Sequence, residues 1–126
     1  MFFIHSVEGG YVPSFEYLSY YDDEAPKAGM ALKFGADYLE KCSGTNKPAY
    51  ISMCEKEDTF TSGIIPVIKV SPDIIFEVEC AGDTSDLYLG AKVTIADDGL
   101  TVTDTTEGGV ATVLHKDGNT VRVRFE

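Results

Sequence analysis

Chemically reactive side chains are few in this sequence of 126 residues, and they lie far apart. There are two histidines, His5 and His115, and three cysteines, Cys42, Cys54 and Cys80. A histidine beside a cysteine could activate a thiolate for nucleophilic catalysis, but no spacing in the sequence brings such a pair together. The odd number of cysteines, with no C-x-x-C spacing, also argues against a disulfide framework and a structural zinc site. We therefore expect reduced, mostly buried thiols.

Carboxylates are abundant, but their spacing matches no metal-binding or hydrolytic motif. They cluster at 22–24, at Asp83 and Asp86, and at 97–98, without the ligand spacing of a calcium loop. The segment "SGTNK" at 43–47 resembles a phosphate-binding loop, yet it lies between two predicted strands and not at the start of a helix. We interpret these groups as turn residues, and we expect no enzyme activity, metal or cofactor.

The charge balance disfavours two classes of partner. The chain has 21 acidic and 10 basic residues, a net charge of −11. Proteins bind nucleic acid largely by neutralising phosphates with Lys and Arg, and anionic membrane surfaces attract the same residues. We therefore predict neither a nucleic-acid nor a membrane partner. The start "MFFIHSVEGG" has no basic region and no long apolar run, so we expect no signal peptide and synthesis in the cytoplasm.

From Lys27 onward, the sequence predicts short strands, and these must position the reactive side chains named above. Asp117-Gly118-Asn119 has the composition of a hairpin turn, and Val121, Val123 and Phe125 after it alternate with polar residues. The prediction is an all-β domain, a small barrel or sandwich, over 27–126. The expected strands, about nine in number, are 30–34, 38–42, 49–54, 65–71, 73–79, 91–95, 100–104, 110–116 and 119–125.

Part of this domain is repeated sixty-one residues later along the chain. "GMALKFGADYLEKCSGT" at 29–45 aligns with "GAKVTIADDGLTVTDTTEGG" at 90–109, with Gly29 on Gly90 and Phe34 on Ile95. Each half offers a strand, a tight turn, a second strand, a loop and a third strand. We interpret these as two similar hairpin units that face each other and close the barrel or sandwich.

Residues 1–26 differ from the rest because they hold seven of the fourteen aromatic residues and lack a regular period. We interpret them as an extended N-terminal arm that must bury its rings, either on its own domain or on a neighbouring molecule. The candidate contacts with such a neighbouring molecule are Phe2, Phe3, Tyr11, Phe15 and Tyr17.

Six segments in order cover nearly the whole chain: "FIHSVEGGYVPSFEYL" at 3–18, "PKAGMALKFG" at 26–35, "SGTNKPAYISM" at 43–53, "GIIPVIKVSPDIIFE" at 63–77, "LGAKVTIADDGLTVT" at 89–103 and "GGVATVLHKDGNTVRVRF" at 108–125. In these segments the chain resembles small head decoration (auxiliary capsid) proteins of tailed bacteriophages and prophages of Gram-positive bacteria. The candidate contacts named above would then be contacts with the capsid or a partner subunit.

This resemblance implies a β-rich structural protein on the outer surface of the virion head. Its expected partner is the major capsid protein, and the expected assembly is a homotrimer that stabilises the finished shell without catalysis. The acidic composition agrees, because it suits the exterior of the head better than the DNA-filled interior. The alternative from another class is a binding module that is displayed on the virion and recognises a host-surface glycan or protein.

Overall fold

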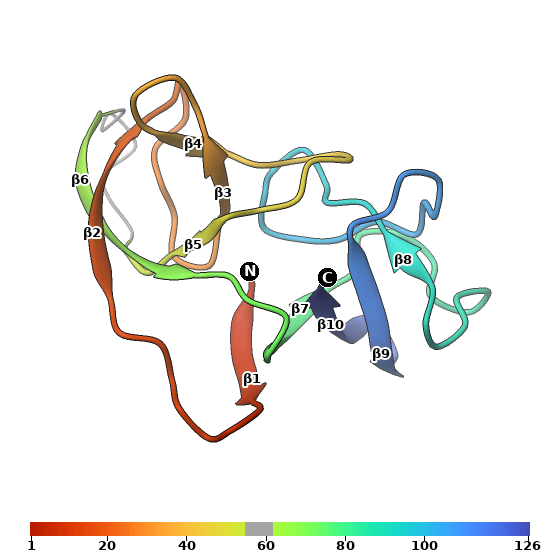
Figure 1. Ribbon diagram of the computed structural model, residues 1–126. Helices are drawn as coiled ribbons and strands as arrows, with labels where there is room; N and C mark the ends of the chain where they lie inside the picture. The colour runs from red at the N-terminus through yellow and green to blue at the C-terminus, as the bar shows by residue number, and fades with distance from the viewer. Residues whose placement is uncertain (55–61) are drawn as a thin grey trace.

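The computed structural model describes residues 1–54 and 62–126, and its regular elements are all β-strands (Figure 1). No described segment forms a helix that could cross a membrane. The all-β class predicted from the sequence is confirmed. The described residues form ten strands, which are β1 (Phe3–Val7), β2 (Glu16–Tyr21), β3 (Ala31–Phe34), β4 (Leu39–Lys41), β5 (Tyr50–Ser52), β6 (Ser62–Lys69), β7 (Ile74–Glu79), β8 (Lys92–Val93), β9 (Ala111–Asp117) and β10 (Thr120–Phe125).

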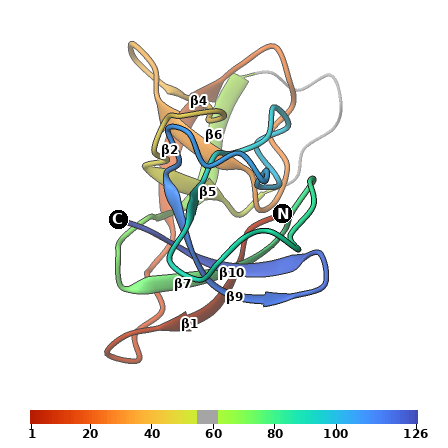
Figure 2. The ribbon, with the colours of Figure 1, turned by 90° about the vertical axis from the view of Figure 1, so that its right-hand side faces the viewer.

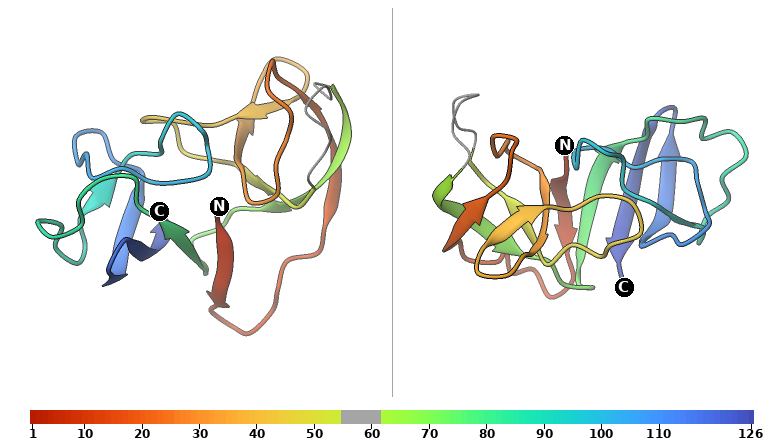
Figure 3. Two further views of the ribbon diagram at one scale, coloured as in Figure 1. Left: turned by 180° about the vertical axis from the view of Figure 1, so that it is seen from behind. Right: turned by 90° about the horizontal axis from the view of Figure 1, so that it is seen from above.

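The strands form two bodies that lie side by side (Figures 1 and 2). A small closed barrel has the strand order β2-β4-β3-β5-β6, and an open sheet has the order β1-β7-β10-β9-β8. The chain passes between them along the connection from β1 to β2 and through the short turn that joins β6 to β7. In the view from above, these two crossings lie along one side of the molecule (Figure 3).

Strand alternation gives the barrel wall two buried faces. Successive side chains of a strand point to opposite faces of a sheet. Accordingly Leu32 belongs to the cluster inside the barrel, whereas its neighbour Ala31 belongs to the cluster between barrel and sheet. Tyr50 and Ile51 on β5 divide in the same way. The barrel interior and the barrel–sheet interface are therefore two separate hydrophobic cores built by the same strands.

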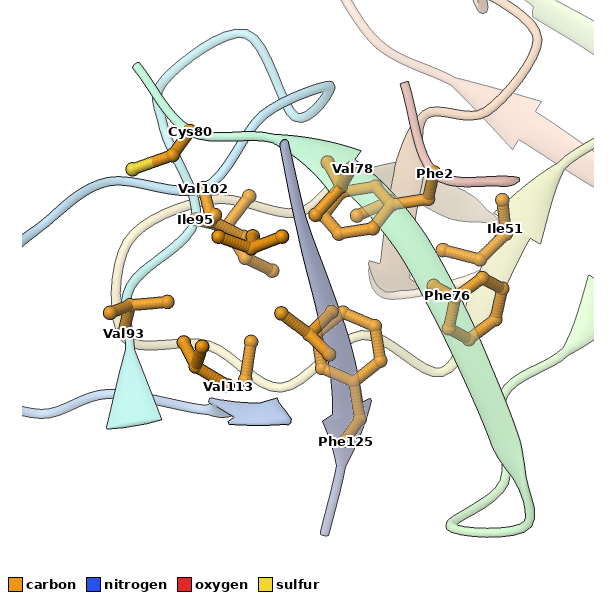
Figure 4. Packing of buried hydrophobic residues seen from close by; sticks show 14 of the residues in the cluster. Phe2, Ile51, Phe76, Val78, Cys80, Val93, Ile95, Val102, Val113 and Phe125 are labelled. Atoms are coloured by element: carbon orange, nitrogen blue, oxygen red, sulfur yellow. The ribbon is translucent and has the colours of Figure 1, made fainter. Parts of the chain in front are cut away.

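Three aromatic rings form the centre of the core between the two bodies (Figure 4). Phe2 meets Phe76 edge to face at a centroid distance of 6.2 Å and Phe125 at 5.6 Å, and Phe76 and Phe125 are 5.7 Å apart. All three side chains are fully buried. The backbone amide of Phe2 also donates to the carbonyl of Gly29 at 2.9 Å, which ties the start of the chain to the barrel.

The first 26 residues are part of both bodies and do not form a separate arm. β1 pairs with β7 in the open sheet, and β2 pairs with β6 in the barrel. The predicted boundary at residue 26 therefore falls inside the fold. The alternation that would have revealed β1 is interrupted by a bulge between Ile4 and Ser6. In β2, tyrosines on both faces of the strand hide the alternation.

The two similar hairpin units contact each other, but they do not close one barrel together. Amide-to-carbonyl bonds join Gly44 and Ile95 in both directions, at 2.7 and 3.1 Å. The first unit is completed into the barrel by β2 and β6, whereas the second lies in the open sheet beside β9. Their registers also differ: Phe34 pairs with Leu39, but the equivalent Ile95 pairs with Val102 and not with Leu100. The longer Asp97-Asp98-Gly99 turn accounts for this shift of two residues.

Because Phe2 is buried and Phe3 is exposed, replacing each by Ala should change the free energy of unfolding by very different amounts. Replacing Phe2 by Ala should lower the free energy of unfolding by about 3–5 kcal/mol, because it removes a ring from the central trio and leaves a cavity. Phe3→Ala, on a side chain that is 53% exposed, should change it by less than about 1 kcal/mol. Urea unfolding of the two variants and of the original protein measures both changes in free energy. Equal losses would contradict the assignment of Phe2 to the core.

Candidate partner-binding surface

The five predicted contact residues lie in different environments. Phe2 is only 1% exposed and has no side-chain surface to offer to a partner, so it does not fit the predicted role. Phe3, on β1, is half exposed at the edge of the open sheet. Tyr11, Phe15 and Tyr17 are exposed and follow one another along the connection from β1 and into β2. The last three therefore lie exposed on one continuous segment of the chain, residues 11–17.

An exposed apolar stripe covers the outer face of the barrel where β2 pairs with β6. Leu18 and Tyr20 of β2 pack inside the barrel, so Tyr17 and Tyr21 point outward. The antiparallel register places Pro66 of β6 opposite Tyr17, and Ile64 opposite Ser19. Ile64 is 66% exposed and Tyr17 is 68% exposed. We call the set Phe15, Tyr17, Tyr21, Ile64 and Pro66 the aromatic stripe.

Three of these residues, Tyr21, Ile64 and Pro66, were missed as sites by the sequence reasoning. Ile64 belongs to a run of apolar residues, "GIIPVI" at 63–68, in which the outward position looks no different from the buried ones. Its exposure follows from the pairing of β6 with β2, which is a long-range property. Tyr21 extends the stripe further, because its ring packs in a tilted arrangement, at a centroid distance of 5.1 Å, on Tyr38 in the turn between β3 and β4.

The connection from β1 to β2 is fixed at its base and presents Tyr11 at its tip. The amide of Glu8 donates to the carbonyl of Asp73 at 2.8 Å, and its carboxylate pairs with Arg124 at 3.3 Å. Gly9 and Gly10 then adopt φ values of 85° and 78°, a region in which residues with a Cβ are strained. This double-glycine corner turns the chain outward and leaves Tyr11 85% exposed.

The histidines and cysteines do not form a reactive site in the described part of the chain. His5 hydrogen-bonds its neighbour Ser6, and His115 is exposed on β9. Cys42 and Cys80 are buried. Burial raises the pKa of Cys42 from 9.0 to about 11, and it raises the pKa of Cys80 as well. Catalytic cysteines need the opposite shift, toward thiolate, so these thiols act as apolar core residues, as the sequence suggested.

Several carboxylates of the predicted clusters stabilise turns. Asp22 accepts the amide of Lys41 at 3.1 Å, and Asp98 accepts the amides of Leu100 and Thr101. Asp83 accepts both the amide and the hydroxyl of Ser85, and these bonds hold its pKa below the ordinary value. No group of three potential ligands for a metal occurs among residues 1–54 and 62–126.

Comparison with known proteins identifies a structural relative. No protein-family model matches the sequence, and no curated protein matches it either. Among solved structures, the chain is similar to the head fiber gp8.5 N base in bacteriophage phi29, with a TM-score of 0.56. The match covers 90% of this chain and 95% of that chain, at 15% sequence identity. At this identity the likeness establishes a shared fold.

The raised pKa of the Cys42 thiol predicts a loss of stability at alkaline pH. Its pKa is higher in the folded protein than in the unfolded chain, so between pH 9 and about 11 the unfolded chain releases the proton and the folded protein keeps it. The free energy of unfolding should therefore fall across this window. The fall should be shallower in Cys42→Ala, as measured by urea unfolding at each pH. An identical slope in the two proteins would contradict the buried thiol.

Proposed function

We propose that this chain is a structural protein of a bacteriophage head. The observation that carries the proposal is the fold, which matches the head fiber gp8.5 N base over almost the full length of both chains. The sequence also resembles head decoration proteins, which belong to the same class of structural proteins. In this proposal the protein has a binding role and no catalytic one.

More specifically, we propose a capsid decoration protein that binds the major capsid protein on the outer surface of the assembled head. A protein that binds only the assembled shell stabilises it by mass action. The net charge of −11 favours a position away from the packaged DNA. A homotrimer, as the resemblance implies, belongs to the same proposal, and light scattering after size-exclusion chromatography would measure it.

The surface that we assign to this binding is the aromatic stripe together with Tyr11. Tyrosine and phenylalanine are enriched in the centres of protein interfaces, where a few such side chains supply most of the binding energy. Here the rings stand on a rigid two-stranded ribbon and on an anchored connection, so little conformational entropy is lost when they bind. Exposed apolar side chains in such a continuous set mark an interaction site.

The proposal predicts that decoration depends on the stripe. The triple variant Tyr11→Ser, Phe15→Ser, Tyr17→Ser should bind shells at least about tenfold more weakly, because truncating such anchors costs about 1 kcal/mol or more each. The measurement is co-sedimentation with shells assembled from the major capsid protein of the genome that encodes this chain. A matched control is Tyr88→Ser, Leu89→Ser, two exposed residues in the loop before β8, which should bind like the original protein.

The outcomes separate the alternatives. If the original protein does not bind the shells, the head-decoration function is wrong. If the triple variant binds as tightly as the original protein, decoration stands and the stripe is the wrong surface. If the isolated protein binds host cell walls but not shells, the virion-displayed binding module is the correct function.

A further inference from the structure

The barrel has an incomplete seam between β2 and β4. On one side β2 pairs with β6 through six consecutive residue pairs, from Glu16 to Tyr21. On the other side it pairs with β4 at a single position, where Tyr20 lies opposite Leu39 in parallel orientation. Over residues 16–19, the edge of β2 that faces β4 therefore has no strand partner in the described part of the chain.

Side chains close the seam at one end. The Tyr20 hydroxyl donates to the carbonyl of Glu24 at 2.7 Å, and the amide of Lys41 donates to Asp22 at 3.1 Å. The ammonium of Lys41 also pairs with the carboxylate of Glu24 at 2.8 Å. These contacts lie at the C-terminal end of β2, so they leave the edge of residues 16–19 open.

A groove lies along this part of the seam. It has a volume of about 260 Å³ and runs between Leu18 and Ser19 of β2 and the turn at 34–39. Its apolar wall includes Phe34, which is 67% exposed and packs edge to face on Tyr50 at 5.7 Å. The groove thus combines a strand edge that lacks a partner with an apolar wall beside it.

The charges next to the groove are negative. The cations on the neighbouring strands are already paired, Lys33 with Glu40 at 3.6 Å and Lys41 with Glu24. Glu16 lies next to Tyr50, where its charge and hydrogen bond add to burial in raising the pKa of the tyrosine. Asp37 lines the groove itself. Neither carboxylate has a cation partner among the ion pairs of the described residues.

We propose that this groove binds an extended peptide segment of another protein, which adds as a strand to the open edge of β2. Main-chain hydrogen bonds to residues 16–19 would hold the segment, as in other cases of strand addition to a sheet edge. An apolar side chain would lie against Leu18 and Phe34, and a Lys or Arg would face Glu16 or Asp37. The groove adjoins the aromatic stripe at Tyr38, which lines the groove and packs against Tyr21. The proposed peptide site does not depend on the head being the partner.

Charge argues against a second copy of this chain as the occupant. The exposed connection between β1 and β2, "EGGYVPSF" at 8–15, carries one acidic residue and no basic residue. It would bring a further carboxylate to a groove that already has two. A foreign segment with alternating apolar residues and a flanking cation is complementary in both shape and charge.

A peptide selection tests the proposal directly. A library of random twelve-residue peptides is selected on the immobilised full chain, and the enriched peptides are titrated in solution. We expect alternating apolar residues with a flanking Lys or Arg. On binding, those amide protons of residues 16–19 that point away from β6 should become protected from exchange in NMR spectra. Glu16→Gln, Asp37→Asn should weaken a selected cationic peptide about tenfold but leave binding of its neutral analogue unchanged.

A matched pair of variants locates the binding. Ala36→Trp places a large ring at the groove from an exposed turn position and should abolish binding, whereas Ala81→Trp, the same change at an exposed position outside the groove, should not. The proposal is overturned if no alternating peptide is enriched, or if the amides of residues 16–19 that point away from β6 stay unprotected when the peptide binds the original protein. It is also overturned if Ala36→Trp binds normally, or if that variant instead loses a self-association seen by sedimentation.

Discussion

The structure depends on one constraint, which is that the wall of a five-stranded barrel must be apolar on both sides where the open sheet covers it. A barrel this small fills its interior with side chains from alternate positions of every strand. The remaining positions would face water, but here the open sheet covers part of them. Ala31, Ile51 and Ile68 point out of the barrel and are fully buried against Phe76 and its neighbours in the sheet. The barrel and the sheet are therefore one folding unit with two cores.

The two ends of the chain complete this shared core. Phe2 and Phe125 lie against each other although they are almost a full chain length apart in sequence. Because β1 belongs to the sheet and β2 to the barrel, the connection between them must cross the junction of the two bodies. The ion pair of Glu8 with Arg124 fixes that crossing from the side of the last strand. The exposure of Tyr11 follows from this topology.

Local signals in the sequence were sufficient for part of the fold. The turn chemistry at Gly118 and the alternation of Val121, Val123 and Phe125 predicted the hairpin of β9 and β10, and the structure confirms it. Long-range pairing could not be predicted in this way. The sequence of β2 shows no alternation of apolar and polar residues, because Tyr17 and Tyr20 occupy opposite faces of the strand. Ile64 is exposed because the open sheet does not cover that end of β6. The groove at the seam likewise depends on a parallel contact between two strands that no local pattern encodes.

The course of β6 explains where a partner can bind. Its outward-facing residues change from 66% exposed at Ile64, through half-buried at Pro66, to fully buried at Ile68. The strand thus runs from a region that the sheet leaves uncovered to one that the sheet covers. An isoleucine at the uncovered end adds nothing to either core, and beside Tyr17 it forms an apolar surface on a protein whose net charge is −11. Folding does not require that surface, whereas burial against another protein would account for it.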